Sequence, residues 1–347
     1  MNIVLIGHYR PGYRLSYYHD WRDAFLDCRP AHSVRVINTY RRYRRPVRLF
    51  ENLPLGWSLP RRALRDVFRG ATPCDLLVLP PSFFYFNRGR RERFFRELAA
   101  AHPMRFQTVF FMENEYRLLE EKVALAEALR ADVLVSQLPQ DVAPGFYGRH
   151  FAGKVVSCPA ALNPQIFRPL RPPAARPIDV GTRSHVYPDS LGDRDRNALL
   201  ECFTSGDGPV RGLKVDISTD ERDRFSRDGW AHFLNRCRAT VSTEAGAVHI
   251  AWEGRPDTAV SGKAISSRHF EAMGTKTVQI MFPGRFNGLL VPGEHYLPLE
   301  RDFSNLAEVC AAVKDDGLIA RMSDVAHEYA LDAHTYAHRV RCLLAQL

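Results

Sequence analysis

Short runs of apolar residues alternate with longer amphipathic segments along the first half of the chain. The apolar runs are of strand length and nearly continuous, which is typical of strands buried on both faces of a parallel sheet. They predict strands at 2–7, 33–38, 75–80, 107–112, 132–137 and 154–158. The segments between them predict helices at 15–27, 61–68, 90–101, 116–130 and 141–149. This alternation predicts an α/β fold with a doubly covered parallel sheet.

A proline-rich stretch interrupts the pattern, with proline at 164, 169, 172, 173 and 177. Such a composition predicts a semi-rigid linker. The alternation then resumes with strands at 178–181, 213–217, 239–243 and 277–282, and with helices at 194–203, 230–237, 267–273, 305–313, 318–330 and 334–344. We therefore predict an N-terminal domain over 1–160, a linker over 161–177 and a C-terminal domain over 178–347. Ligands of such folds bind beyond the carboxyl ends of the strands, so we expect a cleft between the two sheets.

The composition of the 347 residues is globular, with 45% hydrophobic and 25% charged residues. No apolar run approaches the ~18–20 residues of a membrane helix, which argues against an integral membrane protein. The charge is uneven, because residues 1–160 hold 25 Lys and Arg against 15 Asp and Glu, whereas residues 161–347 hold 23 and 24. Basic clusters lie at 40–48 and 88–93. Three interpretations stay open for them: an anionic membrane surface or acceptor, a nucleic acid, or a solvated face.

The start of the chain lacks the basic segment and long apolar run of a signal peptide, so we expect a cytoplasmic protein. The seven cysteines include no C-x-x-C pair, which predicts reduced thiols rather than disulfides or a zinc site. No cluster of carboxylates forms a convincing metal site, and we expect no metal.

Two strand ends carry candidate chemistry in the first half. The loop after the first strand contains His8 and lacks the G-x-G-x-x-G dinucleotide fingerprint, so a pyridine-nucleotide dehydrogenase is disfavoured. Its histidine either lines the cleft or belongs to a plain turn. Glu113 and Glu115 follow the fourth strand. We expect Glu113 to face the cleft as a base or electrostatic stabiliser, and Glu115 to belong to the first turn of the next helix.

The segment around 266–280 is the most informative one. Ser266 and Ser267 can begin a helix whose free N–H groups and dipole suit a diphosphate. Glu271, one turn later, can accept hydrogen bonds from vicinal ribose hydroxyls. Gly274 ends the helix before a buried strand. Serine starts and glycine stops are also common to helices in general, so an ordinary structural role stays open.

Several motifs in the second half resemble those of GT-B glycosyltransferases. The FEAMG segment at 270–274 resembles the F/L-E-A-(M/L)-(A/G)-x-G segment of their nucleotide-sugar domain. GEHYLPL at 293–299 and DFSNL at 302–306 are similar to a stretch of the CgeB-like subgroup, as are IDVG at 178–181 and RDR at 194–196. The resemblance covers about residues 160–347. It implies two facing Rossmann-like domains, with the last helix packing back on the first.

The resemblance also implies donor-binding residues. Glu271 would bind the ribose, and Ser266 and Ser267 would meet the pyrophosphate. Gly181 would allow close approach of the backbone to the donor, and Arg183 would neutralise phosphate charge. The donor would be a nucleoside-diphosphate sugar, used as a co-substrate without any further cofactor.

Other roles follow for the reaction itself. Arg268 would help to stabilise the leaving diphosphate, while Glu113 and His8 are the catalytic candidates on the acceptor side. Glu244 would correspond to the first acid of the paired glutamates in many relatives. Those pairs are usually separated by seven residues, whereas an apparent insertion over 247–262 separates Glu244 from Glu271.

The sequence therefore predicts a metal-independent glycosyltransferase of the hexosyltransferase type (EC 2.4). The acceptor would be a small molecule, a lipid-linked molecule or a glycan, held by the N-terminal domain. A peripheral contact with an anionic membrane is a further expectation, and nucleic acid is the less favoured partner. Two alternatives stay open: a sugar-nucleotide epimerase or other enzyme of this fold, and a non-catalytic protein that binds anionic ligands or nucleic acid.

Overall fold

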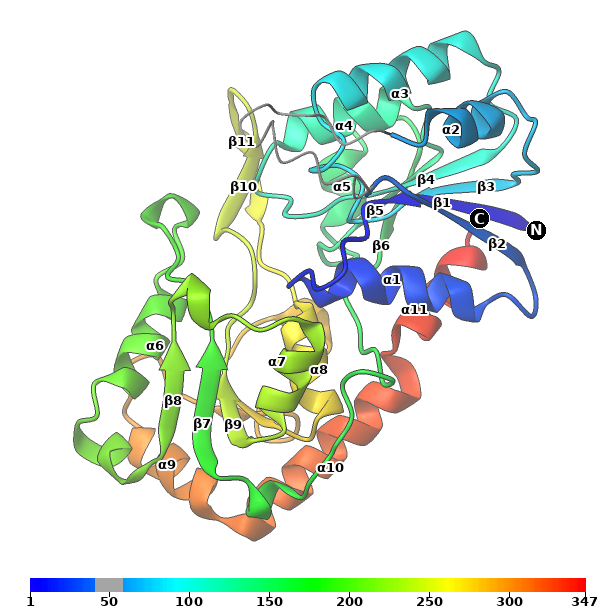
Figure 1. Ribbon diagram of the computed structural model, residues 1–347. Coiled ribbons are helices and arrows are strands. Elements are labelled where there is room, and N and C mark those ends of the chain that lie inside the picture. Colours follow the sequence, from blue (N-terminus) through cyan, green and yellow to red (C-terminus); the bar gives the residue numbers. More distant parts are fainter. Residues whose placement is uncertain (41–58) are drawn as a thin grey trace, which may run out of the picture.

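The computed structural model describes residues 1–40 and 59–347, which form two lobes around two parallel sheets (Figure 1). The first lobe is built around the sheet of residues 2–157, and the second lobe around the sheet of residues 178–298. Of the basic cluster predicted at 40–48, residues 41–48 lie outside the described residues.

The sheet of the first lobe has six parallel strands in the order β2-β1-β3-β4-β5-β6. They are β1 (Asn2–Gly7), β2 (Ser33–Asn38), β3 (Leu76–Leu79), β4 (Gln107–Phe111), β5 (Val133–Ser136) and β6 (Lys154–Ser157). Side chains alternate between its faces, and both faces are apolar. One face packs against α2 (Arg61–Phe68), α3 (Arg90–Ala101), α4 (Leu119–Ala128) and α5 (Ala143–Tyr147). The other packs against α1 (Ser16–Asp27) and α11 (Tyr336–Leu344).

The sheet of the second lobe has five parallel strands in the order β13-β12-β9-β7-β8. They are β7 (Ile178–Arg183), β8 (Val215–Ser218), β9 (Cys237–Val241), β12 (Val278–Met281) and β13 (Leu297–Pro298). Helices α6 (Asp195–Thr204) and α9 (Leu306–Lys314) pack on one face. Helices α7 (Arg227–Leu234) and α8 (Ser267–Gly274) pack on the other, and α10 (Asp316–Ala333) contributes to both.

The two parallel sheets confirm the predicted α/β fold class, and each predicted strand lies within two residues of an observed one. The helix predicted to end at 237 ends at Leu234 instead, because Cys237 already pairs with Ile178 in the sheet. The sequence analysis also missed a hairpin of β10 (His249–Trp252) and β11 (Arg255–Ser261).

The proline-rich segment is anchored to the second lobe at several buried residues, whereas others, such as Leu170, are exposed. Leu162 and Phe167 are buried in the core beside α8 and α10. Arg176 is 4% exposed and donates hydrogen bonds to the carbonyl oxygens of Cys237 at 2.9 Å and Thr275 at 2.6 Å. The buried guanidinium therefore ties this segment to strand and helix ends of the second lobe.

The chain crosses between the lobes again at its end. Tyr336 and Val340 of α11 are buried against the sheet of the first lobe, and the ring centroid of Tyr336 lies 5.0 Å from that of Trp21 in α1. The first lobe thus contains residues from both ends of the chain. A division into independent domains at residues 160 and 178 stays a proposal.

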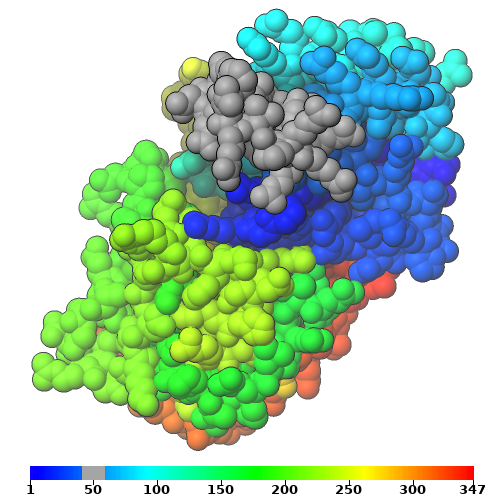
Figure 2. All heavy atoms as spheres, in the orientation of Figure 1, coloured from blue at the N-terminus to red at the C-terminus, as the bar shows by residue number. Residues whose placement is uncertain are grey.

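A polar stripe on α1 faces the second lobe. Ser16, Asp20 and Asp23 share one helix face, at spacings of four and three residues. Asp20 is buried and accepts hydrogen bonds from Arg227 of α7 at 2.8 Å and from Asn163 at 2.7 Å. Arg227 also contacts Asp23 at 3.0 Å. Figure 2 shows this boundary, where the blue N-terminal residues lie directly against the yellow-green residues of the second lobe.

The hairpin of residues 249–261, which we call the arm, reaches from the second lobe to the first (Figure 1). Trp252 is 6% exposed and stacks on Phe146 and His150, with ring centroids 5.4 Å and 3.8 Å apart. Its indole N–H donates to the carbonyl oxygen of Phe146 at 3.2 Å. The insertion at 247–262 therefore provides a second contact between the lobes, remote from α1.

All seven cysteines lie in the described ranges and are unpaired. Within the same ranges, no helix combines the length and the apolar character that crossing a membrane requires.

Replacing Trp252 with alanine removes the aromatic contact of the arm. We expect a loss of roughly 3 kcal/mol in unfolding free energy, as for other buried aromatic side chains. Leu170→Ala is the control, because Leu170 is 51% exposed and its loss costs little. Urea unfolding measures both. Equal stability of Trp252→Ala and the wild-type protein would contradict a packing role for the arm.

Candidate functional site

A cavity of about 470 Å³ lies between the two lobes. The first lobe contributes residues that follow β1 and β4, among them Arg14, Tyr17 and Arg117. The second lobe contributes residues that follow β7 and β8 and the first turns of α8. The strands of each sheet are parallel, so their carboxyl ends share one edge, and the cavity lies where the two edges meet.

Glu271 links both lobes at this cavity. It lies on α8, lines the cavity and is 4% exposed. Its Oε2 accepts a hydrogen bond from the indole N–H of Trp230 at 2.8 Å. Its Oε1 accepts one from the hydroxyl of Ser16 at the start of α1. The predicted ribose-binding carboxylate thus faces the cavity, with both oxygens engaged by the protein itself.

The first turn of α8 forms the adjoining wall. Ser266 precedes the helix, and its backbone N–H donates to Nδ1 of His269 at 3.0 Å. Burial lowers the pKa of His269 to about 4, so its imidazole is neutral near pH 7. Ser266 and Ser267 both line the cavity. The first N–H groups of a helix have no partner within it, so this wall presents hydrogen-bond donors.

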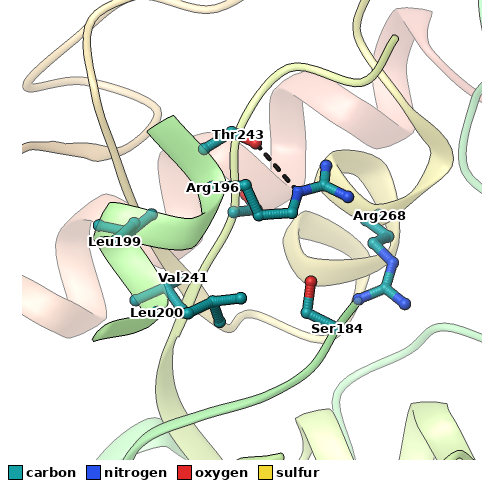
Figure 3. A pocket seen from close by; sticks show the side chains of 8 residues that line it. Ser184, Arg196, Leu199, Leu200, Val241, Thr243 and Arg268 are labelled. Atoms are coloured by element: carbon teal, nitrogen blue, oxygen red, sulfur yellow. Dashed lines mark hydrogen bonds between the residues drawn. The ribbon is translucent and has the colours of Figure 1, made fainter. Parts of the chain in front are cut away.

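Two arginines flank that helix start (Figure 3). Arg268 donates to the carbonyl oxygen of Arg183 and lies 5.1 Å from the ring centroid of Trp230, and burial lowers its pKa to about 10. Arg196 of α6 donates through Nε to the hydroxyl of Thr243 at 3.2 Å. Arg268 is among the donor-site residues predicted from the sequence. Arg196 is not, although it belongs to the RDR segment at 194–196 that carries part of the resemblance.

Arg183 and Gly181, expected to serve the donor, have clear roles inside the second lobe. Arg183 forms an ion pair with Asp216 at 2.7 Å and lies 4.3 Å from the ring centroid of Phe233. Its charge is therefore already compensated by the neighbouring strand. At Gly181, a Cβ atom would lie 2.4 Å from Sγ of Cys237. Packing between β7 and β9 therefore explains this glycine.

Glu244 lies beyond β9, where its side chain holds a loop. Its Oε1 accepts a hydrogen bond from the backbone N–H of Phe286 at 2.7 Å. A Cβ atom at Gly284 would lie 2.7 Å from its Oε2, so the loop runs close to the carboxylate. The neighbouring Ala245 lines the cavity, whereas Glu244 does not line it and helps to position this part of the cavity wall.

Glu113 follows β4 as expected, but it is only 1% exposed. Its Oε1 accepts hydrogen bonds from the hydroxyls of Tyr17 and Tyr18, both at 2.5 Å. Burial raises its pKa to about 7. Because Tyr17 lines the cavity, Glu113 reaches the cavity through a tyrosine rather than directly.

His8 lies near the same edge of the first lobe and is 7% exposed. Its ring stacks on Phe86 with centroids 4.0 Å apart. Burial lowers its pKa to about 4, and the charges of Arg91 and Arg10 act in the same direction. A neutral imidazole in these surroundings is a weak proton acceptor at pH 7.

The loop after β4 is held by buried polar groups. Glu115 does not begin a helix, since α4 starts at Leu119; it accepts hydrogen bonds from Ser136 and the backbone N–H of Gln137. Lys122 of α4 donates through Nζ to the carbonyl oxygens of Glu113, Asn114 and Arg117. Two residues of the loop have positive φ, Asn114 at 44° and Leu118 at 52°. These hydrogen bonds fix the loop that carries Asn114 and Arg117 into the cavity.

Over residues 1–40 and 59–347, no group of three or more His, Cys, Asp or Glu side chains could hold a metal ion. Metal independence of the reaction stays a prediction.

Residues 201–345 match the family model described as glycosyl transferase-like. Among solved structures, the chain is similar to an α-glucosyltransferase in complex with UDP and a 13-mer DNA, with a TM-score of 0.65 and 10% identity over 100% of this chain and 98% of that chain. HepE from Anabaena in complex with UDP-glucose gives a TM-score of 0.58 and 14% identity, with 100% of both chains covered. Sucrose-phosphate synthase from Thermosynechococcus elongatus gives 0.56 and 15%, with 99% and 98% covered. No curated protein matches.

The likenesses to solved structures span both lobes. This is the GT-B fold. The family match extends from α6 to the last helix and so includes Glu271 and the start of α8. The CgeB-like subgroup stays a prediction.

The raised pKa of Glu113 makes stability depend on pH. Between its ordinary value of 4.5 and about 7, the unfolded chain releases this proton while the folded protein retains it. The folded state therefore loses stability as pH rises through this window. Glu113→Gln keeps an acceptor for both tyrosines but does not titrate. We expect the stability of this variant relative to the wild-type protein to increase by roughly 3 kcal/mol between pH 4.5 and 7.

Urea unfolding at pH 4.5, 6 and 8 measures this difference. Groups common to both proteins cancel, because only the difference between variant and wild type is compared. A difference that is constant over this range would show that Glu113 is not held protonated by burial.

Proposed function

We propose that the protein transfers a sugar from a nucleoside-diphosphate sugar, bound by the second lobe, to an acceptor bound by the first. The observation that carries this proposal is the position of Glu271 on α8. It lies four residues after Ser267, about 6 Å along the helix axis. A carboxylate suits ribose hydroxyls, and a helix start with Arg268 and Arg196 beside it suits a diphosphate. One nucleoside diphosphate spans both positions.

The same groups serve the chemistry. In the reaction, the bond between the anomeric carbon and the diphosphate oxygen breaks, and a bond to an acceptor hydroxyl oxygen forms. The electron pair of the broken bond stays on the diphosphate, whose negative charge increases. Arg268, Arg196 and the N–H groups at the start of α8 stabilise this charge without a metal ion. The acceptor hydroxyl loses its proton during transfer, and this proton passes to an oxygen of the departing diphosphate or to water.

Glu113 is proposed to support the acceptor side through Tyr17. The carboxyl group accepts the phenol hydrogen of Tyr17 through Oε1 and so orients this ring at the cavity. His8, on the same edge of the first lobe, is a second candidate for a role on the acceptor side.

A hexose on uridine diphosphate is the first donor to test, because HepE, one of the similar structures, is in complex with UDP-glucose. We also propose a cytoplasmic location, in keeping with seven unpaired cysteines. The peripheral membrane contact has no support in the described residues.

Binding of UDP and UDP-glucose tests the donor site. We expect both to raise the melting temperature of the wild-type protein. Glu271→Ala removes hydrogen bonds from a charged group to the ribose, so its affinity for UDP should fall roughly 10- to 100-fold. Glu308→Ala, which removes an exposed glutamate of α9, is the matched control. Calorimetric titration measures the affinities.

Glu271→Gln separates binding from folding, because its amide still offers an oxygen to Trp230 or Ser16. We expect reduced UDP affinity in this variant with a nearly normal melting temperature. Unchanged UDP affinity in both Glu271 variants would remove this residue from the donor site. If UDP, GDP, TDP, CDP and ADP all failed to bind, the proposed function would be wrong.

A further inference from the structure

Positive charge is in excess in the cavity between the lobes. Six arginines line it: Arg14, Arg117, Arg183, Arg196, Arg224 and Arg268. Glu271 is the one carboxylate among the described residues that line it, and its oxygens are engaged by Trp230 and Ser16. The cavity is therefore built for anions.

Few of these arginines are compensated by a carboxylate. Arg183 is paired with Asp216, and Arg224 has a long contact of 3.7 Å with the exposed Glu221. In the two ranges that the structure covers, no carboxylate oxygen lies within 4.0 Å of the guanidinium nitrogens of the other four. Water screens the charge of the exposed arginines, but the lining of the cavity keeps a net positive charge.

Arg224 shows most clearly that a partner is missing. Its Nε and Nη2 atoms are buried and have no hydrogen-bond partner among the described residues. Burial lowers its pKa, Glu221 opposes this effect, and the positive charge of Arg14 from the other lobe lowers it further. Two guanidinium groups that influence each other across a cavity repel, and unsatisfied buried donors cost free energy. An anion bound between Arg224 and Arg14 would relieve the repulsion between them.

The donor accounts for only part of this charge. Its diphosphate carries roughly two negative charges and is proposed to lie against Arg268 and Arg196 at the start of α8. Arg14 and Arg117 belong to the opposite wall, in the loops after β1 and β4 of the first lobe. Lys122 fixes the loop of Arg117, because its Nζ donates a hydrogen bond to the carbonyl oxygen of Arg117. These two arginines and Arg224 therefore remain for a second anion.

We propose, on the basis of the proposed function, that the acceptor carries a phosphate group close to the hydroxyl that receives the sugar, and that Arg14, Arg117 and Arg224 bind this phosphate. A phosphate has several oxygens, which arginines from different loops can bind at the same time. A carboxylate has two oxygens, and the paired N–H groups of a single arginine already bind both. The phosphate thereby selects the acceptor and places its hydroxyl on the first-lobe side of the donor.

The test uses protein saturated with UDP, so that the donor diphosphate position is filled. Glycerol 3-phosphate is the probe and glycerol its neutral counterpart, and binding is followed by calorimetric titration. We expect glycerol 3-phosphate to bind at least tenfold more tightly than glycerol. In Arg14→Gln/Arg117→Gln, its affinity should fall at least tenfold while the affinity for UDP changes less than twofold.

Arg29→Gln/Arg105→Gln is the matched control, since it removes two exposed arginines of the first lobe that do not line the cavity. It should bind glycerol 3-phosphate as the wild-type protein does. Equal binding of glycerol 3-phosphate and glycerol would overturn the proposal. An equal loss of affinity for glycerol 3-phosphate in both double variants would also overturn the proposal, because the loss would then reflect only the net charge of the protein.

Failure of the donor site is distinguishable from failure of the phosphate site. If UDP does not bind, the same titrations with UDP-free protein and the same variants test the phosphate site alone. Dimethyl phosphate as an additional probe distinguishes a diester source from a terminal phosphate. Tighter binding of the diester indicates a phosphate inside a chain, and tighter binding of glycerol 3-phosphate indicates a terminal one.

Discussion

The contact between the polar face of α1 and the second lobe determines how the two halves of the molecule meet. The apolar face of α1 is committed to the first sheet through Trp21 and Phe25. Its opposite face holds Asp20, whose buried carboxylate needs a cationic partner, and Arg227 of the second lobe provides it at 2.8 Å. A different arrangement of the lobes that kept Asp20 buried would leave its carboxyl group without Arg227, so the pair favours this orientation. The carboxyl ends of both sheets then enclose one cavity.

The rest of the site follows from that orientation. Ser16 lies one turn before Asp20 on the same face and thus meets Glu271. The helix also directs Tyr17 and Tyr18 towards Glu113. One helix therefore connects the ribose-binding candidate of one lobe with the buried carboxylate of the other. The arm adds a second contact at α5, through Trp252.

Much of the fold could be predicted from the sequence, because strands buried on both faces need continuous apolar runs. The hairpin was missed because β11 is mostly exposed and polar, and its partner surface lies on α5 of the other lobe. The position of Ser266, Ser267 and Glu271 at the cavity could be predicted, because helical spacing alone brings them to one end of α8. The roles of Arg183 and Glu244 could not, since their partners Asp216 and Phe286 lie 33 and 42 residues further along the chain.

The hydrogen bond between Ser16 and Glu271 has a thermodynamic consequence for nucleotide exchange. In the proposed donor site, a ribose hydroxyl at Glu271 competes with the hydroxyl of Ser16 for the same carboxylate oxygen. To the extent that the ribose needs the position held by Ser16, its observed affinity is the intrinsic affinity reduced by the population in which Ser16 has left. The serine then opposes retention of the nucleotide product in the same way.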